Sequence, residues 1–193
     1  SIVLEADPPL HTRTRTVLAR TMTPGIVKQL RERFEREAEI LVDRILDLGE
    51  FDGVTDFAEH YPTKVFPDAV GLPAKGRENL LPYGSMVFNS FGPRNEFTEA
   101  AMANADAVRG WIMAACARDT LTKDGLGAMI YAAVDAGELK EDEAGMLVRS
   151  FLSAGVDTTV NAFGNLLWCL ATHPDQWRKL RERPELARNA FEE

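Results

Sequence analysis

The sequence predicts an all-α protein. Apolar residues recur at helical spacing, most clearly over residues 26–48, and no stretch shows the alternation typical of a β-strand. Glycine and proline residues divide the chain into segments of helix length. Of the 193 residues, 45% are hydrophobic, so the chain can bury one sizeable core. No internal repeat, low-complexity tract or interdomain linker is visible, which indicates a single domain.

Proline and glycine mark the expected helix boundaries, because proline is tolerated in the first turn of a helix and glycine favours its end. The longest helix is expected over residues 141–172, ended by His173-Pro174. Before it, helices are expected after Pro8-Pro9 and from Thr23-Pro24 to about Gly49. Two further helices are expected over residues 55–70, with interruptions at Pro62 and Pro67, and over residues 76–91, with an imperfection at Pro82. The remaining helices are expected over residues 96–118, 125–136, 175–183 and 185–193.

Charge and cysteine usage exclude several classes of protein. The net charge of −8 argues against nucleic acid as a partner. No run of about 18 apolar residues and no signal peptide is visible, so no membrane association is expected. Cys116 and Cys169 lie on separate apolar helical stretches, which favours small buried thiols over a disulfide framework and indicates a cytoplasmic protein.

Residues 154–159, Ala-Gly-Val-Asp-Thr-Thr, interrupt the longest helical pattern with poor helix formers. Glycine in a helix interior costs about 1 kcal/mol relative to alanine, and aspartate and threonine are also unfavourable. A carboxylate at Asp157 beside a hydroxyl at Thr158 is what proton delivery to a bound oxygen species requires. In the alternative interpretation, threonine hydroxyls bond to the carbonyl four residues back and only bend the helix.

These six residues resemble the distal-helix signature of the cytochrome P-450 superfamily, the haem-thiolate monooxygenases. Three further segments resemble family motifs in the same order along the chain. They are residues 7–15, similar to the Asp-Pro-Pro segment and the His-x-x-x-Arg helix; residues 172–176, similar to the turn after the long helix; and residues 187–193, similar to the lead-in to Glu-x-x-Arg. The resemblance implies the central, mainly helical part of the P-450 fold, whose β-sheets mostly lie outside this region.

The resemblance also implies haem as the cofactor of the full-length protein. His11 and Arg15, four residues apart on one helix face, would clamp a haem propionate. Ala154 and Gly155 would let the planar cofactor and O2 approach the backbone. In the same scheme Thr158 would hydrogen-bond the bound oxygen species or hold a water against it, and Asp157 would relay protons from solvent.

Ferredoxin and ferredoxin reductase are the electron donors that the resemblance implies. Residues 11–36 carry seven basic side chains against two acidic ones, a local balance of +5, which agrees with docking of an acidic ferredoxin. Within this segment, Arg13 and Arg20 are expected to contact solvent or a partner. The alternative is an ordinary solvated basic helix face.

Two family features are absent from the sequence: the arginine of Glu-x-x-Arg and the later Phe-x-x-Gly cysteine loop. Neither Cys116 nor Cys169 has the surroundings of the axial ligand, so no metal ligand is expected in this chain. We therefore expect residues 1–193 to form a single partial domain, truncated at both ends, inactive alone, and with apolar surface of the long helix uncovered. The alternative is a truncated, non-catalytic helical binding protein or a pseudogene product.

A candidate substrate site combines two segments. Arg149, Ser150 and Ser153 lie one and two turns before the signature, where an arginine can bind a carboxylate through two hydrogen bonds. Phe88 and Phe91, three residues apart, would supply two aromatic walls. Both segments resemble bacterial P-450s that oxidise para-substituted benzoic acids, so hydroxylation or O-demethylation of a small aromatic acid is the expected reaction. The alternative is that the phenylalanines belong to the core and the arginine is an ordinary surface charge.

Overall fold

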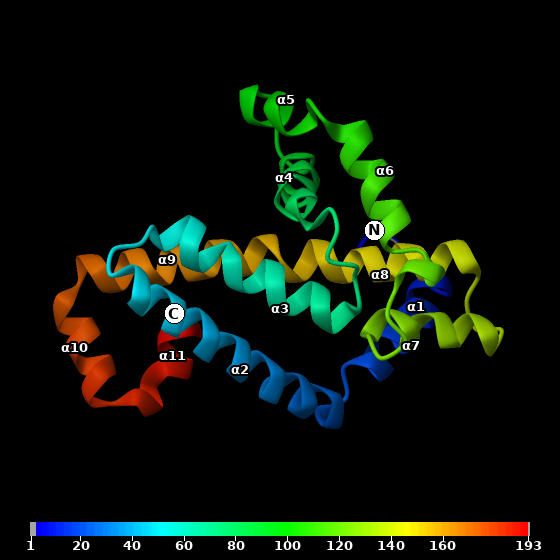
Figure 1. Cartoon of the computed structure of the whole chain (residues 1–193). Helices are drawn as coiled ribbons and strands as arrows, with labels where there is room; N and C mark the ends of the chain where they lie inside the picture. Colours follow the sequence, from blue (N-terminus) through cyan, green and yellow to red (C-terminus); the bar gives the residue numbers. More distant parts are fainter. Residues whose placement is uncertain (1–2, 193) are drawn as a thin grey trace.

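The computed structural model describes residues 3–192, and within this range every regular element is a helix, which confirms the all-α prediction. Two consecutive helices, α8 (Glu141–Gly155) and α9 (Asp157–Thr172), form a nearly straight rod through the molecule (Figure 1). The elements are α1 (Leu10–Thr21), α2 (Pro24–Leu48), the π-helix η1 (Gly53–Ala58), α3 (His60–Val70), η2 (Arg77–Asn79), α4 (Leu80–Asn89), α5 (Glu96–Met102), α6 (Ala105–Ala115), η3 (Arg118–Thr120), α7 (Leu126–Asp135), α8 (Glu141–Gly155), α9 (Asp157–Thr172), α10 (Pro174–Glu182), η4 (Pro184–Leu186) and α11 (Ala187–Glu192). Helices α3, α4, α6 and α7 contact this rod, whereas α2 packs on α3 and α5 packs on α4.

The prediction of one uninterrupted helix over residues 141–172 is wrong at one residue. Val156 has φ −99° and ψ −69° and separates α8 from α9. The break is local, because the carbonyl of Val156 still accepts a hydrogen bond of 3.0 Å from the N–H of Val160. The side chain of Val156 is buried, so the break is fixed by packing. It falls inside the segment of poor helix formers, as local propensity would favour.

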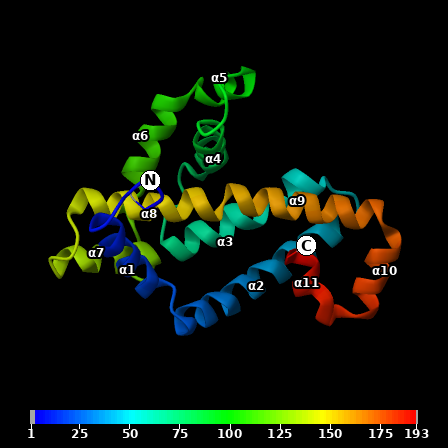
Figure 2. The same ribbon diagram turned by 180° about the vertical axis from the view of Figure 1, so that it is seen from behind.

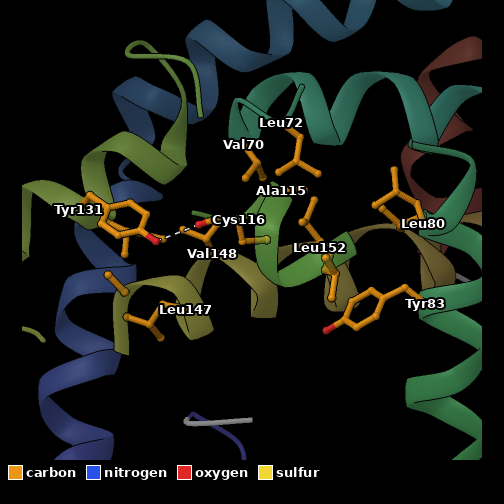
Figure 3. Close-up of a cluster of buried hydrophobic side chains, with 14 of the residues drawn as sticks. Val70, Leu72, Leu80, Tyr83, Ala115, Cys116, Tyr131, Leu147, Val148 and Leu152 are labelled. Atoms are coloured by element: carbon orange, nitrogen blue, oxygen red, sulfur yellow. Dashed lines mark hydrogen bonds between the residues drawn. The ribbon is translucent and has the colours of Figure 1, made fainter. Parts of the chain in front are cut away.

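The core lies around α8, whose Leu147, Val148 and Leu152 are fully buried (Figure 3). Val70 at the end of α3 and residues of α4, α6 and α7 pack against them. Each fully buried leucine or valine contributes about 1.5–3 kcal/mol relative to an exposed one. The rod is therefore held most firmly along α8, in the first half of its length.

Two predicted helices differ from the structure: one is divided at another position than expected, and one is divided where no break was expected. Instead of breaks at Pro62 and Pro67 in a helix over 55–70, a π-helix ends at Ala58 and α3 then runs through both prolines. Pro62 lies in the first turn of α3, where no intrahelical N–H is needed. The predicted helix over 96–118 is divided at Ala103 and Asn104, since asparagine favours helix starts over interiors.

Helix α1 lies beside α7 and α8 (Figure 2), and two ion pairs join it to the corner between them. Arg13 pairs with Glu143 on α8, and Arg20 donates to both carboxylate oxygens of Glu138 in the loop before α8. Glu143 also accepts a hydrogen bond of 2.9 Å from the N–H of Lys140 and so caps α8. The expectation that Arg13 and Arg20 contact solvent or a partner is therefore incomplete, because acidic side chains of the same chain also bind these half-exposed arginines.

The far end of the rod is covered less well. Helix α9 has no fully buried residue, and the Trp168 side chain is 70% exposed, which confirms the expectation of uncovered apolar surface on the long helix. Phe163 anchors this part of α9 through edge and tilted ring contacts with centroid separations of 5.5–5.7 Å, to Phe57, Tyr61 and Phe191.

The two cysteines differ in environment. Cys116 is buried, as expected, and its carbonyl accepts a hydrogen bond from the Tyr131 hydroxyl (Figure 3). Cys169 is exposed on α9, which corrects the prediction that both thiols are buried, because the face of α9 that carries it has no covering element among the described residues. Across residues 3–192, no helix has the length and apolar character to cross a membrane.

Candidate functional site

A cavity of about 670 Å³ lies between α4, α6 and α8, with α1 and the residues before it closing one side. Its lining is mainly apolar, with a few convergent polar groups, which is typical of a site for a small organic ligand. It is lined by Val3, Leu4, Glu5, Arg15, Leu18, Tyr83, Met86, Val87, Phe88, Ser90, Phe91, Met102, Arg109, Ile112, Met113, Arg149, Ser150, Phe151, Ser153 and Ala154.

The structure brings the five predicted substrate residues together in this cavity. The rings of Phe88 and Phe91 meet edge to face, with centroids 6.3 Å apart. Arg149, Ser150 and Ser153 line the cavity from α8. The two segments are far apart in the sequence, and the crossing of α4 over α8 places them in one space (Figure 1). Their role in substrate binding stays a prediction.

The serine hydroxyls of α8 are engaged with the helix backbone. Ser150 donates to the carbonyl of Met146 at 2.9 Å, and Ser153 donates to the carbonyl of Ser150 at 3.2 Å. Both hydroxyls must therefore rotate before they can donate to a ligand. The guanidinium of Arg149, with its five N–H groups, is the stronger donor set for an anionic ligand in this part of the cavity.

Tyr83, Met86 and Ile112 are cavity residues that the sequence analysis missed. Tyr83 lies on α4 with Phe88, but a separation of five residues does not place two side chains on one helix face, so the helical period gave no signal for Tyr83. Its side chain is 5% exposed, and burial raises the pKa of Tyr83, opposed by the nearby Arg149 charge and by Ser153. A buried neutral phenol thus lies beside the guanidinium.

Asp157 and Thr158 lie at the start of α9, outside the cavity lining. The Thr158 hydroxyl donates to the carbonyl of Ala154 at 2.8 Å, which is the backbone bond of the alternative interpretation. Asn161 donates to the Asp157 carbonyl at 2.9 Å and reaches its carboxylate at 3.4 Å. Partial burial raises the pKa of Asp157. A carboxyl group with a raised pKa can hold and release a proton closer to neutral pH.

Gly155 lies against the ring of Phe66 on α3. A Cβ atom added at Gly155 would lie 2.2 Å from Cε1 of that ring, and Phe66 in turn packs on Phe151 at a centroid separation of 6.4 Å. Close packing of α3 on α8 thus accounts for the glycine in physical terms. A further role of Gly155 beside a cofactor stays a prediction.

The two predicted clamp residues on α1 occupy different environments. Arg15 is exposed and lines the cavity, whereas the half-buried His11 is not among the lining residues. Ala154 and Thr158 are both exposed on the rod, one helical turn apart, and Ala154 borders the cavity. In residues 3–192 no group of three or more histidine, cysteine or acidic side chains is arranged to hold a metal ion.

Comparison with known proteins places this arrangement in a family context. The family model described as cytochrome P450 matches residues 103–188. Among curated proteins, cytochrome p450 CYP199A2 of Rhodopseudomonas palustris is 49% identical over 100% of this chain and 47% of its own length. Cytochrome P450 107B1 of Saccharopolyspora erythraea is 31% identical over 99% of this chain and 46% of its own. The chain thus spans about half the length of these relatives.

Solved structures give the same result for the fold. P450BioI, in complex with an acyl carrier protein ligated to hexadec-9Z-enoic acid, superposes on 98% of this chain with a TM-score of 0.83 and 25% identity. Myxobacterial cytochrome P450 CYP267B1, in complex with myristic acid, also covers 98%, with a TM-score of 0.82 and 30% identity. The matches cover 50% and 47% of those chains, respectively.

Proposed function

Because this chain belongs to the cytochrome P450 family, we propose that it forms the central helical part of a haem-dependent monooxygenase that acts on a small aromatic acid. The observation that carries the substrate class is the cavity in which Phe88 and Phe91 face the Arg149 segment. Residues 1–193 would then be one partial domain of a longer protein, in line with their coverage of about half of each relative.

Members of the family bind haem, and the residues of this chain fit that group. The exposed Ala154 and Thr158 present only a methyl group and a small polar side chain, which suits the close approach of a planar ring. Arg15 lines the cavity that Ala154 borders, and its guanidinium can bind a propionate carboxylate through two hydrogen bonds. His11 lies one helical turn before Arg15. When bound, haem supplies the activation of O2 and the insertion of an oxygen atom into the substrate.

Asp157 and Thr158 have the chemistry to deliver protons beside such a cofactor. The Thr158 hydroxyl lies over the Ala154 carbonyl, at the exposed surface that Ala154 shares. Its oxygen keeps lone pairs that can accept a hydrogen bond from a water. The neighbouring Asp157 carboxyl has a raised pKa, so it can take a proton from solvent and pass it on.

The cavity residues divide into a flat apolar slot and a cationic anchor for a carboxylate. Phe88 and Phe91 would enclose an aromatic ring, and Arg149 would bind its carboxylate. The ring would thereby be oriented with its para substituent toward the Ala154 end of the cavity. Loss of a charged hydrogen-bond partner costs about 1.5–3 kcal/mol, so Arg149→Ala should weaken binding of a benzoate roughly 10- to 100-fold.

The electron donors in this proposal are a ferredoxin and its reductase, docking near the basic residues 11–36. Three of these basic groups, Arg13, Arg20 and Arg31, already pair with acidic side chains of the chain itself. The attraction to an acidic partner therefore rests on the other basic residues of the segment, and docking should weaken as salt is added.

We propose in addition that this chain alone is inactive. Burial raises the pKa of the Cys116 thiol to about 12, and neither Cys116 nor Cys169 lines the cavity. A thiolate ligand needs a lowered pKa and access to the iron. Incubation of the purified chain with haem tests this point, since a stable ferrous–carbon monoxide band typical of thiolate ligation would contradict it.

The test of the function uses the complete reading frame that contains this chain, expressed with haem and redox partners. Addition of 4-methoxybenzoate should shift the haem spectrum and release formaldehyde, and Arg149→Ala should weaken both responses. Arg188→Ala, an exposed residue paired within α11, is the matched control. A benzoate affinity that is equal in wild type and Arg149→Ala would refute the carboxylate anchor, and the absence of oxygen-dependent product from a range of aromatic acids would refute the substrate class.

A further inference from the structure

Gly84 is a buried glycine in the middle of α4, where an alanine would form a more stable helix. Helix α4 crosses the rod at its break and contacts both α8 and α9 (Figure 1). A small residue at a helix crossing lets two backbones approach closely. The position therefore raises the question of which atoms occupy the space that a side chain would take.

The neighbour of Gly84 is the side chain of Asp157. A Cβ atom added at Gly84 would lie 2.8 Å from Cβ of Asp157, 3.0 Å from Oδ1 and 3.1 Å from Cγ. The two shortest of these distances are to Cβ and to Oδ1 of Asp157, so rotation of the carboxylate group alone would not make room for a side chain at position 84. The side-chain amide of Asn161 lies 3.4 Å from Oδ2. The carboxylate therefore lies against the backbone of α4 and within reach of the Asn161 side chain.

The same helix supplies a wall of the cavity. Tyr83 and Met86, on either side of Gly84 in the sequence, line the cavity, and so does Phe88 one turn later. Helix α4 therefore contacts the cavity through its side chains and the Asp157 carboxylate through its bare backbone. Any side chain at position 84 would have to displace either α4 or the carboxylate.

We propose that Gly84 is a positioning residue for Asp157: its missing side chain lets α4 hold the carboxylate in place beside Thr158. The functional consequence rests on the proposed function, in which this carboxylate passes protons. Gly84 touches neither the cofactor nor the substrate in this scheme and acts through Asp157. Because α4 also forms the cavity wall, the placement of the carboxylate depends on the same helix that contacts the substrate.

Carboxyl ¹³C NMR of the protein made from the complete reading frame tests the positioning by a readout other than activity. The signal of Asp157 is assigned by its loss in Asp157→Asn, and its pKa is measured in wild type, Gly84→Ala and Gly164→Ala. Gly164 lies on α9 with nothing within 4 Å of an added Cβ, so it is the matched control. We expect Gly84→Ala to push the carboxylate toward solvent and lower its pKa toward the ordinary value, and Gly164→Ala to leave it unchanged. An unchanged pKa in Gly84→Ala overturns the proposal.

A second variant covers the case in which Gly84→Ala does not fold. Replacement of Asp157 by glycine removes the three nearest atoms that the added Cβ would meet. Cooperative unfolding of Gly84→Ala/Asp157→Gly would assign the clash to Asp157 and support the proposal. Continued failure to fold would overturn it, because the space would then be needed by other atoms.

The holoenzyme made from the complete reading frame tests the functional consequence. A misplaced proton donor should lower kcat of Gly84→Ala roughly ten- to hundredfold with little change in KM. In an Asp157→Asn background the same substitution should have no further effect. An equal loss in both backgrounds overturns the proposal. If Asp157→Asn itself leaves kcat unchanged, the proton role in the proposed function fails, while the NMR titration still decides whether Gly84 positions the carboxylate.

Discussion

Substitution of Gly155 by alanine puts two opposing effects of known size against each other. Alanine favours a helix over glycine by about 1 kcal/mol in the interior, and by less at the last residue of α8. Against this gain, the new methyl group would lie 2.2–2.5 Å from three atoms of the Phe66 ring. Overpacking of a well-packed region costs about 1–3 kcal/mol. We therefore expect a net loss of roughly 1–2 kcal/mol.

Urea unfolding followed by far-ultraviolet circular dichroism measures this loss, with Gly164→Ala as the control. Gly164 lies within α9 and has open space around it, so alanine there should stabilise the chain by up to about 1 kcal/mol. The two substitutions are chemically identical, and only the surroundings differ. Their effects on the free energy of unfolding should therefore have opposite signs.

A double mutant assigns the loss to the ring of Phe66. Phe66→Leu removes the edge of the ring that Gly155 faces, so Gly155→Ala should cost less in that background than in wild type. Equal costs in the two backgrounds would show that the methyl group does not meet Phe66. A stabilising effect of Gly155→Ala in wild type would refute the packing explanation for this glycine altogether.

Three further outcomes follow from the structure. Because burial raises the pKa of Asp157, the protonated Asp157 side chain contributes stability below the ordinary pKa of 3.8, and this contribution is lost as pH rises through the raised pKa. Urea titrations at a series of pH values should show this fall in the free energy of unfolding for wild type and not for Asp157→Asn. Glu143→Ala removes both an ion pair and a helix cap, so it should lower the free energy of unfolding by about 1–2 kcal/mol. Glu35→Ala removes only an exposed ion pair and should cost at most about 0.5 kcal/mol, so equal costs of the two variants in thermal unfolding would contradict this expectation. Iodoacetamide should modify the exposed Cys169 of the folded chain rapidly and the buried Cys116 only on unfolding, as mass spectrometry of tryptic peptides can follow.

The sequence was sufficient for the helices with strong boundary signals. Pro24 and Gly49 bound α2, and Gly125 precedes α7, as expected. It failed where the deciding contact is tertiary. The break at Val156 depends on how that side chain is buried, and the continuity of α3 through Pro67 depends on its packing, neither of which local propensity reports.

The candidate site shows the same division. Helical period alone places Arg149 and Ser153 on one face of α8, and Phe88 beside Phe91, so each half of the cavity could be predicted. The crossing of α4 over α8 that joins the halves is set by side chains distant in the sequence. Tyr83 lies on α4 with Phe88, but a tyrosine at this position is equally compatible with the core, and only its place in the cavity wall beside the guanidinium marks it as a cavity residue.

Two glycines of this chain show why a poor helix former is an ambiguous signal. Gly155 lies in a segment that resembles a family motif, and its space is filled by Phe66, a packing contact. Gly84 lies in no motif, and its space is filled by Asp157, the carboxylate of the candidate proton path. In both cases glycine lowers helix propensity, more at the interior Gly84 than at Gly155, the last residue of α8. The identity of the neighbouring atom therefore separates a packing glycine from a positioning glycine, and that identity becomes known only when α3, α4 and the rod are assembled.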